Sequence, residues 1–475
     1  MSQLKQSPAL EAIQAGRRPH VVVVGAGFAG IHAAQELGKL PVDVTVIDRR
    51  NHHTFQPLLY QVALAVLSPA QIAQPIRTIL AKNANTQVLM DEVVKIDTTS
   101  RLLKLGSGTT IPYDYLVLGT GATHSYFGHE EWAKYAPGLK SIEDAIEIRR
   151  RVLLAFELAE RHMLEHGWHP PLNFVIVGGG PTGVELAGAI SDIARLYLRH
   201  DFRHIDPAKA RVLVIEGSPR VLATFPEDLS AKARKQLEDI GVEVWNNKQV
   251  TEVGAGFVKV GDERIEATVV LWAAGVAASP LGRMLFDVPT NQSNSPQSPF
   301  FDRRGAVFVD KQLNPQELPE VFVCGDLAHI EQDGHLVPGV AQPAMQMGRH
   351  AVKIIAADLA GKPRPDFRYF DKGDMATIGR LAAVAKIEWP FKAHWGGFMA
   401  WLTWLVVHLY FLIGFRNRLA LFATWAWTYF TFREGSRLIT GDQRLPGWEE
   451  ATHSSTQAAK PAAQEELATP GSRAV

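Results

Sequence analysis

Two glycine-rich turns with the spacing G-x-G-x-x-G are the best candidates in this chain for phosphate binding. The first turn contains Gly25, Gly27 and Gly30, and the second contains Gly178, Gly180 and Gly183. The first glycine permits a tight turn, the second lets the backbone approach a pyrophosphate, and the third lets a helix pack closely on a strand. The phosphate then lies at a helix N-terminus, where free N–H groups favour an anion. The two turns therefore predict two dinucleotide sites.

An acidic residue follows each turn at the place where a ribose would be bound. Asp48 lies 18 residues after the first turn, and Glu216 lies 33 residues after the second. A carboxylate there accepts hydrogen bonds from ribose hydroxyls, and one such charged bond contributes about 1.5–3 kcal/mol. Glu216 would also repel the 2′-phosphate of NADPH and therefore favours NADH, a preference that the nearby Arg220 tempers.

Short apolar runs predict the strands that position these turns and acids. Those around the first turn are His20–Val24, Asp43–Ile47, Tyr115–Leu118 and Val321–Cys324, and those around the second are Asn173–Val177, Arg211–Ile215 and Val269–Trp272. We expect helices at Ile31–Leu40 and from Val184 onward. A strand, glycine turn, helix and strand that recur about 150 residues apart predict an α/β chain with two Rossmann-like dinucleotide-binding domains.

A further acid follows the last strand of the first group. Asp326 comes directly after Gly325, at the carboxyl end of the strand, where it could hold the ribityl hydroxyls of FAD. A turn aspartate or a helix N-cap is the alternative. Two nucleotide sites in one chain, with such an aspartate, favour a flavoprotein.

Composition excludes several other classes. The 475 residues fit about three domains, and 49 basic residues balance 49 acidic ones, so no basic excess favours nucleic acid. One cysteine, Cys324, excludes an intramolecular disulfide framework, a CxxC redox pair and a thiolate zinc site. We find no metal-binding spacing such as HExxH, and we predict no metal site. The first twenty residues contain no apolar core of a secretory signal.

Together these motifs resemble flavoproteins with two dinucleotide-binding domains, and among them the type II NADH dehydrogenases, which are non-proton-pumping NADH:quinone oxidoreductases. The segments that carry the resemblance are 48–63, 178–188, 321–328, 341–348 and 408–418. The resemblance implies FAD and NADH as cofactors and a membrane quinone, ubiquinone or menaquinone, as partner. It also implies an NADH-binding domain inserted in the FAD-binding domain, followed by a C-terminal helical membrane-anchoring segment. The expected parts are an N-terminal arm (1–19), the FAD domain (20–140 and 296–385), the NADH domain (141–295), the membrane-association segment (386–446) and a disordered tail (447–475).

The resemblance also assigns site residues. The FAD contacts it implies are Gly25, Gly27, Phe28, Ala29, Gly30, Asp48, Arg49, Gly121, Asp326, Ala341 and Gln342. The NADH contacts it implies are Gly178, Gly180, Pro181, Thr182, Gly183, Glu216 and Gly275. At Asp48 the chain departs from the glutamate that is commoner in such flavoproteins, and the shorter side chain could lie farther from the ribose.

Three residues are predicted to serve the chemistry: Glu185, Gln342 and Gln346. In the family that the chain resembles, Ala341 and the two glutamines look like the wall of the quinone site. Pro343 predicts a helix that starts after Gln342 and places both glutamines on one face, with its positive end favouring reduced flavin. Glu185 could relay a proton to the quinone. The alternative for Gln342 and Gln346 is that they are ordinary polar residues of a helix. The alternative for Glu185 is that it only gains stability from the helix dipole.

A C-terminal apolar region predicts contact with a membrane. Gly396–Phe415 is twenty residues long, enough to cross a bilayer, whereas Leu419–Phe432 is only fourteen. Arginines lie between the two stretches, and a single span would place them on the outer side, which the positive-inside rule disfavours. We therefore expect a helical pair in one leaflet, with tryptophans at the headgroups and arginines on lipid phosphates. Two alternatives remain: a single membrane-spanning helix, and a helix buried in the core or in a dimer interface.

The resemblance implies peripheral attachment to the cytoplasmic face of the inner membrane, with a possible homodimer. Disulfide reductases and sulfide:quinone oxidoreductases of this fold need a cysteine pair, which the single cysteine excludes. Two other functions stay open: a soluble NADH-dependent reductase of an iron–sulfur protein, which would not need the apolar region, and a non-catalytic FAD- and NADH-binding protein that acts through partners.

Overall fold

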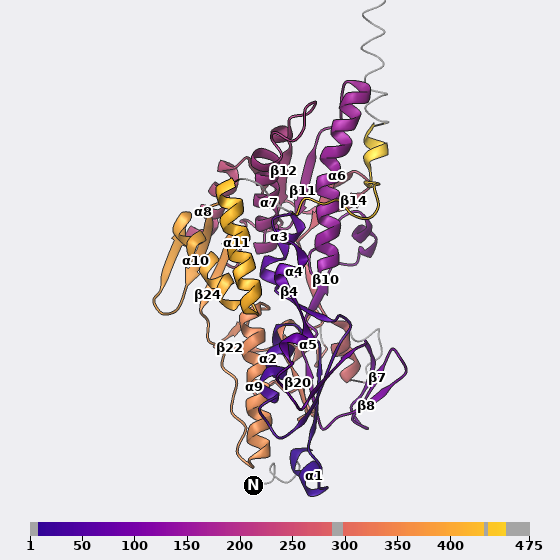
Figure 1. Ribbon diagram of the computed structural model, residues 1–475, viewed down its shortest axis with the longest axis vertical. Helices are drawn as coiled ribbons and strands as arrows, with labels where there is room; N and C mark the ends of the chain where they lie inside the picture. Colours follow the sequence, from indigo (N-terminus) through magenta and orange to yellow (C-terminus); the bar gives the residue numbers. More distant parts are fainter. Residues whose placement is uncertain (1–7, 287–297, 432–435, 453–475) are drawn as a thin grey trace, which may run out of the picture. The chain divides into compact units, whose positions relative to one another are not determined.

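The computed structural model describes residues 8–286, 298–431 and 436–452. Most of the predicted disordered tail, part of the N-terminal arm and the polar stretch 287–297 lie outside these residues. The chain divides into two compact units, each of them discontinuous in sequence. Unit 1 contains 1–55, 73–124 and 276–371, and unit 2 contains 56–72, 125–275 and 372–475. Each unit is described below by itself (Figure 1).

Unit 1 is built around a parallel sheet of five strands. In spatial order these are β20 (Val321–Val323), β9 (Tyr115–Leu118), β1 (His20–Val24), β2 (Asp43–Asp48) and β5 (Thr86–Met90). In the centre, Val24 of β1 lies beside Ile47 of β2 and Leu118 of β9. The central strands are buried over nearly their whole length, as expected for a parallel sheet covered on both faces.

Two helices of unit 1 pack closely on each other: α2 (Phe28–Leu37) and α9 (Ala341–Leu359). Gly348 makes this approach possible, because a Cβ atom there would lie 2.1 Å from the carbonyl oxygen of Ala29. The antiparallel strands of unit 1 are β3 (His52–Thr54) with β4 (Ala73–Pro75), β6 (Val93–Asp97) with β7 (Leu102–Leu105) and β8 (Thr110–Pro112), β10 (Ala122–His124) with β18 (Val276–Ala278), and β22 (Glu331–Gln332) with β23 (His335–Leu336). The remaining short elements are α1 (Pro8–Gln14), α5 (Ile76–Ile79), η6 (Pro280–Leu285), η7 (Gly325–Leu327) and the parallel pair β19 (Val307–Phe308) and β21 (Ala328–His329).

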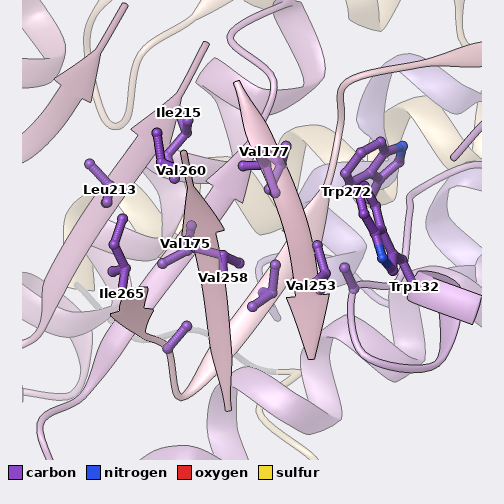
Figure 2. Packing of buried hydrophobic residues seen from close by; sticks show 14 of the residues in the cluster. Trp132, Val175, Val177, Leu213, Ile215, Val253, Val258, Val260, Ile265 and Trp272 are labelled. Atoms are coloured by element: carbon purple, nitrogen blue, oxygen red, sulfur yellow. The ribbon is translucent and has the colours of Figure 1, made fainter. Parts of the chain in front are cut away.

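Unit 2 repeats the parallel arrangement with four strands. In spatial order these are β13 (Val242–Trp245), β12 (Arg211–Ile215), β11 (Asn173–Val177) and β17 (Val269–Trp272). Side chains of β11 and β12 pack with those of a three-stranded antiparallel sheet and with Trp132 and Trp272, as Figure 2 shows. That sheet contains β14 (Val250–Gly254), β15 (Phe257–Val260) and β16 (Glu263–Glu266).

The main helices of unit 2 are α6 (Ile142–His166), α7 (Pro181–Asp192) and α8 (Glu227–Asp239). A capping box begins α6, in which the Ser141 side chain accepts from the Asp144 N–H and the Asp144 side chain accepts from the Ser141 N–H. Gly167, with φ of 74°, ends it. The short elements are η2 (Gln56–Leu58), α3 (Leu59–Ala63), α4 (Pro69–Ile72), η3 (Glu130–Lys134), a π-helical turn η4 (Ile193–Tyr197) and η5 (Pro207–Lys209).

The C-terminal part of unit 2 is a small sheet followed by two helices. The strands are β24 (Gly373–Thr377), β25 (Ala383–Ile387) and β26 (Ala393–Gly396), and the helices are α10 (Phe398–Phe411) and α11 (Phe415–Thr431). The sequence did not predict this sheet. It packs against α7 and α8, and α10 packs on β24, β25 and β26.

Four sequence predictions of helix bounds were wrong. The twenty-residue helix predicted for Gly396–Phe415 is a fourteen-residue helix. At its start β26 extends to Gly396 and Gly397 adopts a φ of 71°, and after its end Leu412 is extended and Gly414 adopts a φ of 91°. The helices after the glycine turns start directly at Phe28 and Pro181, so the third glycine of each motif lies inside the first helical turn. Helix α9 begins at Ala341, two residues before the predicted start at Pro343.

Candidate active site

The first glycine turn joins β1 to α2 in unit 1. Gly25 has a φ of 90°, and a Cβ atom there would lie 2.7 Å from the carbonyl oxygen of Gly119. A Cβ on Gly30 would lie 1.8 Å from the carbonyl oxygen of Gly25, so the third glycine permits helix α2 to fold back on the turn. At Gly27 the nearest atom would be 3.7 Å away. Space beside the second glycine is what a pyrophosphate requires.

Phe28 and Ala29 open α2 and support the turn in different ways. The Phe28 ring packs edge-to-face on His53 and Phe55, at centroid distances of 5.2 and 5.7 Å. Ala29 is buried, and Gly119 lies close to its side chain. Their backbone, rather than their side chains, belongs to the first turn of the helix, where N–H groups are free to bind an anion.

Asp48 closes β2 and turns toward the same loop. Its carboxylate accepts hydrogen bonds from the Ala26 N–H at 2.6 Å and from the Arg50 N–H at 2.7 Å. A carboxylate has about four acceptor positions, so two stay available for ribose hydroxyls. Asp48 therefore reaches its glycine turn, although its side chain is shorter than that of the glutamate that is commoner at this position. Arg49 beside it is exposed.

The segment after β20 brings Asp326 and the start of α9 together in unit 1. Gly325 has a φ of 72°, its N–H donates to the Met347 sulfur at 3.2 Å, and a Cβ there would lie 3.2 Å from that of Ala344. Among the described residues, no group donates to the Asp326 carboxylate, which leaves its oxygens available to a ligand. Gly121, on the preceding strand end, has a φ of 67° and open space above it.

Gln342 and Gln346 lie on α9, one turn apart, and both are partly exposed. The Gln346 amide is engaged at both ends: its Nε2 donates to the Phe370 carbonyl at 3.0 Å, and its Oε1 accepts from the Phe370 N–H at 2.9 Å. The described residues provide no such partner for Gln342. The two glutamines therefore differ, because one is held in place and the other is available to a ligand. Ala341 is the first residue of the helix, which no side chain caps.

The second glycine turn joins β11 to α7 in unit 2 and repeats the first. Gly178 has a φ of 106°, and a Cβ on it would lie 2.6 Å from backbone atoms of Ala273. A Cβ on Gly183 would lie 1.9 Å from the Gly178 carbonyl oxygen, whereas one on Gly180 would meet nothing within 4 Å. Pro181 is the first residue of α7, where its missing N–H costs no helical hydrogen bond, and Thr182 follows it.

Glu216 comes directly after β12, at a position in unit 2 equivalent to that of Asp48 at the end of β2. Its carboxylate accepts from the Gly179 N–H at 2.5 Å and from the Ser218 N–H at 2.7 Å. Arg220, which tempered the preference for NADH, donates to the carbonyl oxygens of Phe225 and Ala223 instead. Gly275 lies against Phe127, whose ring would be 2.6 Å from an added Cβ.

Glu185 lies on the first turns of α7 in unit 2, next to β24. The Thr377 N–H donates to its carboxyl group, but burial outweighs this bond and raises the pKa of Glu185 to about 8. At neutral pH the group is therefore a carboxylic acid that can give up a proton. The predicted role of Glu185 needs such a group.

Sequence analysis missed the network around Glu185. The Tyr60 hydroxyl bonds Thr377 Oγ1 at 2.8 Å and accepts from Gln61 Nε2 at 3.0 Å, and Gln61 Oε1 accepts from Trp425 Nε1 at 2.8 Å. The pKa of Tyr60 is raised by burial and by the nearby Glu185. No local spacing reveals the bonds to Thr377 and Trp425, because they join residues 317 and 364 positions apart.

Arg149 of α6 fixes the segment that carries Tyr60. Its guanidinium donates to the carbonyl oxygens of Val62, at 2.5 and 2.9 Å, and of Leu67, at 2.8 Å. Since the side chain is buried, these charge-assisted bonds hold α3 and the following residues firmly. Helix α3, the C-terminal part of the segment 48–63 that carried part of the resemblance, is thus held in place by Arg149.

Helices α10 and α11 turn polar groups inward and apolar groups outward. Thr424 accepts from Gln71 Nε2 at 2.6 Å and Thr428 is buried, so the threonine stripe of α11 faces the protein. We define the apolar surface of α10 and α11 by its exposed side chains: Phe398, Met399, Leu402, Val406, Tyr410, Phe415, Leu419, Phe422, Trp427 and Phe430. None of the described helices is long and apolar enough to cross a membrane.

The prediction that the C-terminal tryptophans lie together at lipid headgroups was too broad. Trp401, Trp404 and Trp425 are buried within unit 2, whereas Trp389 and Trp427 are more than half exposed. The physical reason is that α10 and α11 pack on each other and on the small sheet through large aromatic rings. Arg416 and Arg418 are exposed at the junction between the helices.

Comparison with known proteins identifies the family. The model of the pyridine nucleotide-disulphide oxidoreductase family matches residues 19–348, and that of the NDH2 C-terminal domain matches residues 372–434. The chain is 42% identical over 441 residues to the type II NADH:quinone oxidoreductase Ndh of Mycobacterium tuberculosis, with 90% of this chain and 92% of that protein covered. This chain belongs to the type II NADH:quinone oxidoreductases.

Other members of the family are more distant. The type II NADH:quinone oxidoreductase of Haemophilus influenzae is 29% identical, over 78% of this chain and 88% of that protein. The structure of NDH2 from Plasmodium falciparum in complex with NADH has a TM-score of 0.76 at 19% identity, covering 90% of this chain and all of that chain. These findings confirm the predicted family, its enzyme class, the two-Rossmann fold and the cofactors FAD and NADH.

Proposed function

We propose that this type II NADH:quinone oxidoreductase uses FAD bound by unit 1 to pass a hydride equivalent from NADH, bound by unit 2, to a membrane quinone without pumping protons. One observation carries the proposal. Each unit has a glycine turn with free space at its second glycine, and an acid at the end of the next strand that bonds the turn. One chain thus contains two complete dinucleotide-binding frameworks.

FAD fits unit 1 on the chemistry of its donors and acceptors. The pyrophosphate would lie beside Gly27 on the free N–H groups of Phe28 and Ala29, and Asp48 would accept from the adenosine ribose, with Arg49 nearby. Asp326 and Gly121 would hold the ribityl chain, and the first N–H groups of α9 at Ala341 and Gln342 would face the ring. Held by these residues, FAD would supply a two-electron carrier that can take up a hydride from NADH and reduce a quinone.

NADH fits unit 2 by the same logic. Its pyrophosphate would lie beside Gly180 at the start of α7, on Pro181 and Thr182, and Glu216 would accept from the ribose. A carboxylate at that position repels the 2′-phosphate of NADPH. Arg220 does not offset this preference, because its guanidinium is engaged by its own loop. Gly275 would leave room beside the nicotinamide half.

Quinone reduction requires a proton donor, and Glu185 is suited to that role. Burial keeps it protonated at neutral pH, and the Thr377 N–H orients it. We propose Gln342 as a donor to the quinone, whereas Gln346 positions the Phe370 segment. This assignment gives the two glutamines different roles, in keeping with their different contacts.

We also propose that the apolar surface of α10 and α11 attaches the protein to one leaflet, on the cytoplasmic face of the membrane. Ten exposed apolar side chains on two neighbouring helices exceed what a water-facing surface usually carries. Arg416 and Arg418 at the helix junction could contact lipid phosphates. Attachment there would give a lipid-soluble quinone access to the protein.

Proteoliposomes test the proposal as a whole. Purified protein added to vesicles that contain ubiquinone or menaquinone should oxidise NADH, and a potential-sensitive dye should report no membrane potential. Comparison of the two quinones identifies the acceptor. NADH-dependent formation of a potential would contradict the non-pumping assignment, and a requirement for an added iron–sulfur protein would contradict the quinone assignment.

A further inference from the structure

The order of the strands in unit 2 divides a bound dinucleotide into two halves. The glycine turn after β11 would receive the pyrophosphate, and Glu216 after β12 would receive the adenosine ribose. Because β11 lies between β12 and β17, the nicotinamide half would extend to the other side of the turn, over the end of β17. This end adjoins the turn, since a Cβ on Gly178 would lie 2.6 Å from the Ala273 carbonyl group and 2.7 Å from the Ala274 Cα.

An aromatic ring lies beside the end of β17. The Phe127 ring packs directly on Gly275, where an added Cβ would lie 2.6 Å from the tip of the ring. It also makes an edge contact with Trp272, which Figure 2 labels, at a centroid distance of 6.2 Å. Phe127 nevertheless remains 66% exposed. Most of its ring is therefore uncovered next to the place where the nicotinamide half would lie, and one flat ring can pack there against another.

The backbone of Phe127 is held in a conformation that a bulky residue seldom adopts. Its φ of 56° lies in the left-handed region, where the Cβ atom crowds the following carbonyl oxygen. The two preceding residues fix this conformation: the Tyr126 ring stacks on Trp272 at 5.1 Å, and Ser125 donates to the Gly275 carbonyl oxygen at 3.1 Å and accepts from Trp272 Nε1 at 2.8 Å. Strain of this kind is typical of residues that serve a binding site.

We propose that Phe127 packs against the nicotinamide ring of NADH and holds that ring over the end of β17. The inference rests on the proposed binding of NADH by unit 2, and it adds the residue that recognises the nicotinamide end. The glycine turn and Glu216 bind the pyrophosphate and the adenosine ribose, which every adenine dinucleotide contains. Phe127 contacts the ring that distinguishes NADH from the others, and its apolar face suits the uncharged reduced form of that ring.

Two ligands test this role because one contains the nicotinamide ring and the other lacks it. NAD⁺ has the ring, ADP-ribose does not, and neither reduces the flavin, so calorimetry can give their dissociation constants for the holoenzyme. In F127A the dissociation constant for NAD⁺ should rise about three- to tenfold, as expected for the loss of one contact between aromatic rings, while that for ADP-ribose stays unchanged. F127Y keeps the ring and should bind both ligands as the wild type does.

Flavin reduction and thermal melting provide further measurements. In F127A the NADH concentration that gives half of the maximal rate of flavin bleaching should rise by a similar factor, while reoxidation by a short-chain quinone keeps its rate. F391A removes a 52% exposed phenylalanine from the C-terminal part of unit 2, and as the matched control it should change neither quantity. F127G removes the ring and also relieves the left-handed backbone, so it should melt at a higher temperature than F127A and bind NAD⁺ as weakly.

The outcomes separate the inference from the function on which it rests. An F127A variant that binds NAD⁺ as tightly as the wild type would overturn the inference. An equal loss of affinity for NAD⁺ and ADP-ribose would also overturn it, because Phe127 would then only support the shape of the whole site. A wild type that binds neither ligand would instead contradict the proposed NADH site of unit 2, and the inference with it.

Discussion

Glu216 accepts a hydrogen bond from the Gly179 N–H at 2.5 Å, and so holds the glycine turn at the start of α7 against the end of β12. Asp48 does the same to Ala26 at 2.6 Å in the other unit. In both units the acid therefore shapes the glycine turn, and it keeps acceptor positions for the ribose that we propose it binds. We thus propose two functions for each acid. Substitutions can separate these functions.

The charge of Glu216 should set the preference for NADH. In E216Q the amide oxygen can still accept from Gly179, but the repulsion of a 2′-phosphate is removed. At the high effective dielectric of a surface site, that repulsion is about 1–2 kcal/mol, so the ratio of kcat/KM for NADH to that for NADPH should fall about tenfold. E243Q, which removes an exposed carboxylate paired with Arg211, is the control. An unchanged ratio in E216Q would show that another residue selects the cofactor.

Gly180 should be required for NADH binding and not for folding. An alanine Cβ there meets no atom within 4 Å, and the backbone φ of −71° suits any residue. G180A should therefore keep its FAD and its melting temperature, yet raise KM for NADH about tenfold or more because the methyl group fills the space of the pyrophosphate. G106A, at a tolerant turn in unit 1, should leave KM unchanged. In G183A the Cβ would lie 1.9 Å from the Gly178 carbonyl oxygen, so that variant should fail to fold.

Glu185 should make unit 2 less stable as pH rises. Its folded pKa of about 8 exceeds the value of 4.5 expected in the unfolded chain, so between these values the folded state holds a proton that the unfolded state releases. The contribution of Glu185 to the free energy of unfolding is fully present below about pH 4.5. It is lost progressively up to about pH 8, by an amount on the order of a few kcal/mol. E185Q cannot ionise and should melt at a higher temperature than the wild type at pH 8, but not at pH 5.

E185Q should lower the activity of the protein, although it raises the melting temperature at pH 8. E185Q should lower turnover with quinone by about a hundredfold while its FAD content and its rate of reduction by NADH stay normal. E157Q, at an exposed position on α6, serves as the control for both stability and turnover. Equal turnover in E185Q and the wild type would remove Glu185 from the mechanism.

The apolar surface of α10 and α11 should determine binding to vesicles. Phe415 and Phe430 are 81% and 86% exposed, and the burial of each phenylalanine in lipid contributes about 1.5–3 kcal/mol. The double variant F415S/F430S should therefore sediment with vesicles at least tenfold less, and keep its activity with a short-chain quinone. L164S changes an equally apolar, 65% exposed side chain on α6 and should bind as the wild type does. Unaltered sedimentation of the double variant would place the contact elsewhere.

Local sequence patterns predicted the nucleotide frameworks well. The runs His20–Val24 and Asn173–Val177 form β1 and β11 with the predicted bounds, because a buried parallel strand must be apolar throughout and the glycine turn ends it. The helix starts were missed by three residues, since the second half of each glycine motif already belongs to the first helical turn. The apolar run at 396–415 predicted one long helix, but its first glycine ends a strand, and the chain turns at Leu412 and Gly414 before the next helix begins.

The chemistry around Glu185 was outside the reach of such patterns. Tyr60 and Thr377 are 317 positions apart, and Gln61 and Trp425 are 364 positions apart. What gives these residues a shared environment is packing within unit 2. The sequence could suggest a proton donor at Glu185, but only the folded chain shows which groups surround it.

The most direct test of the account is an anaerobic two-step mixing experiment on the holoenzyme. NADH is mixed with the protein while the visible absorption band of the flavin is followed, and a short-chain quinone is then added. We expect rapid bleaching by NADH, slow bleaching by NADPH, and rapid return of the band on addition of quinone. Bleaching that quinone does not reverse would contradict the assignment of the acceptor, and no bleaching by NADH would contradict the account at its first step.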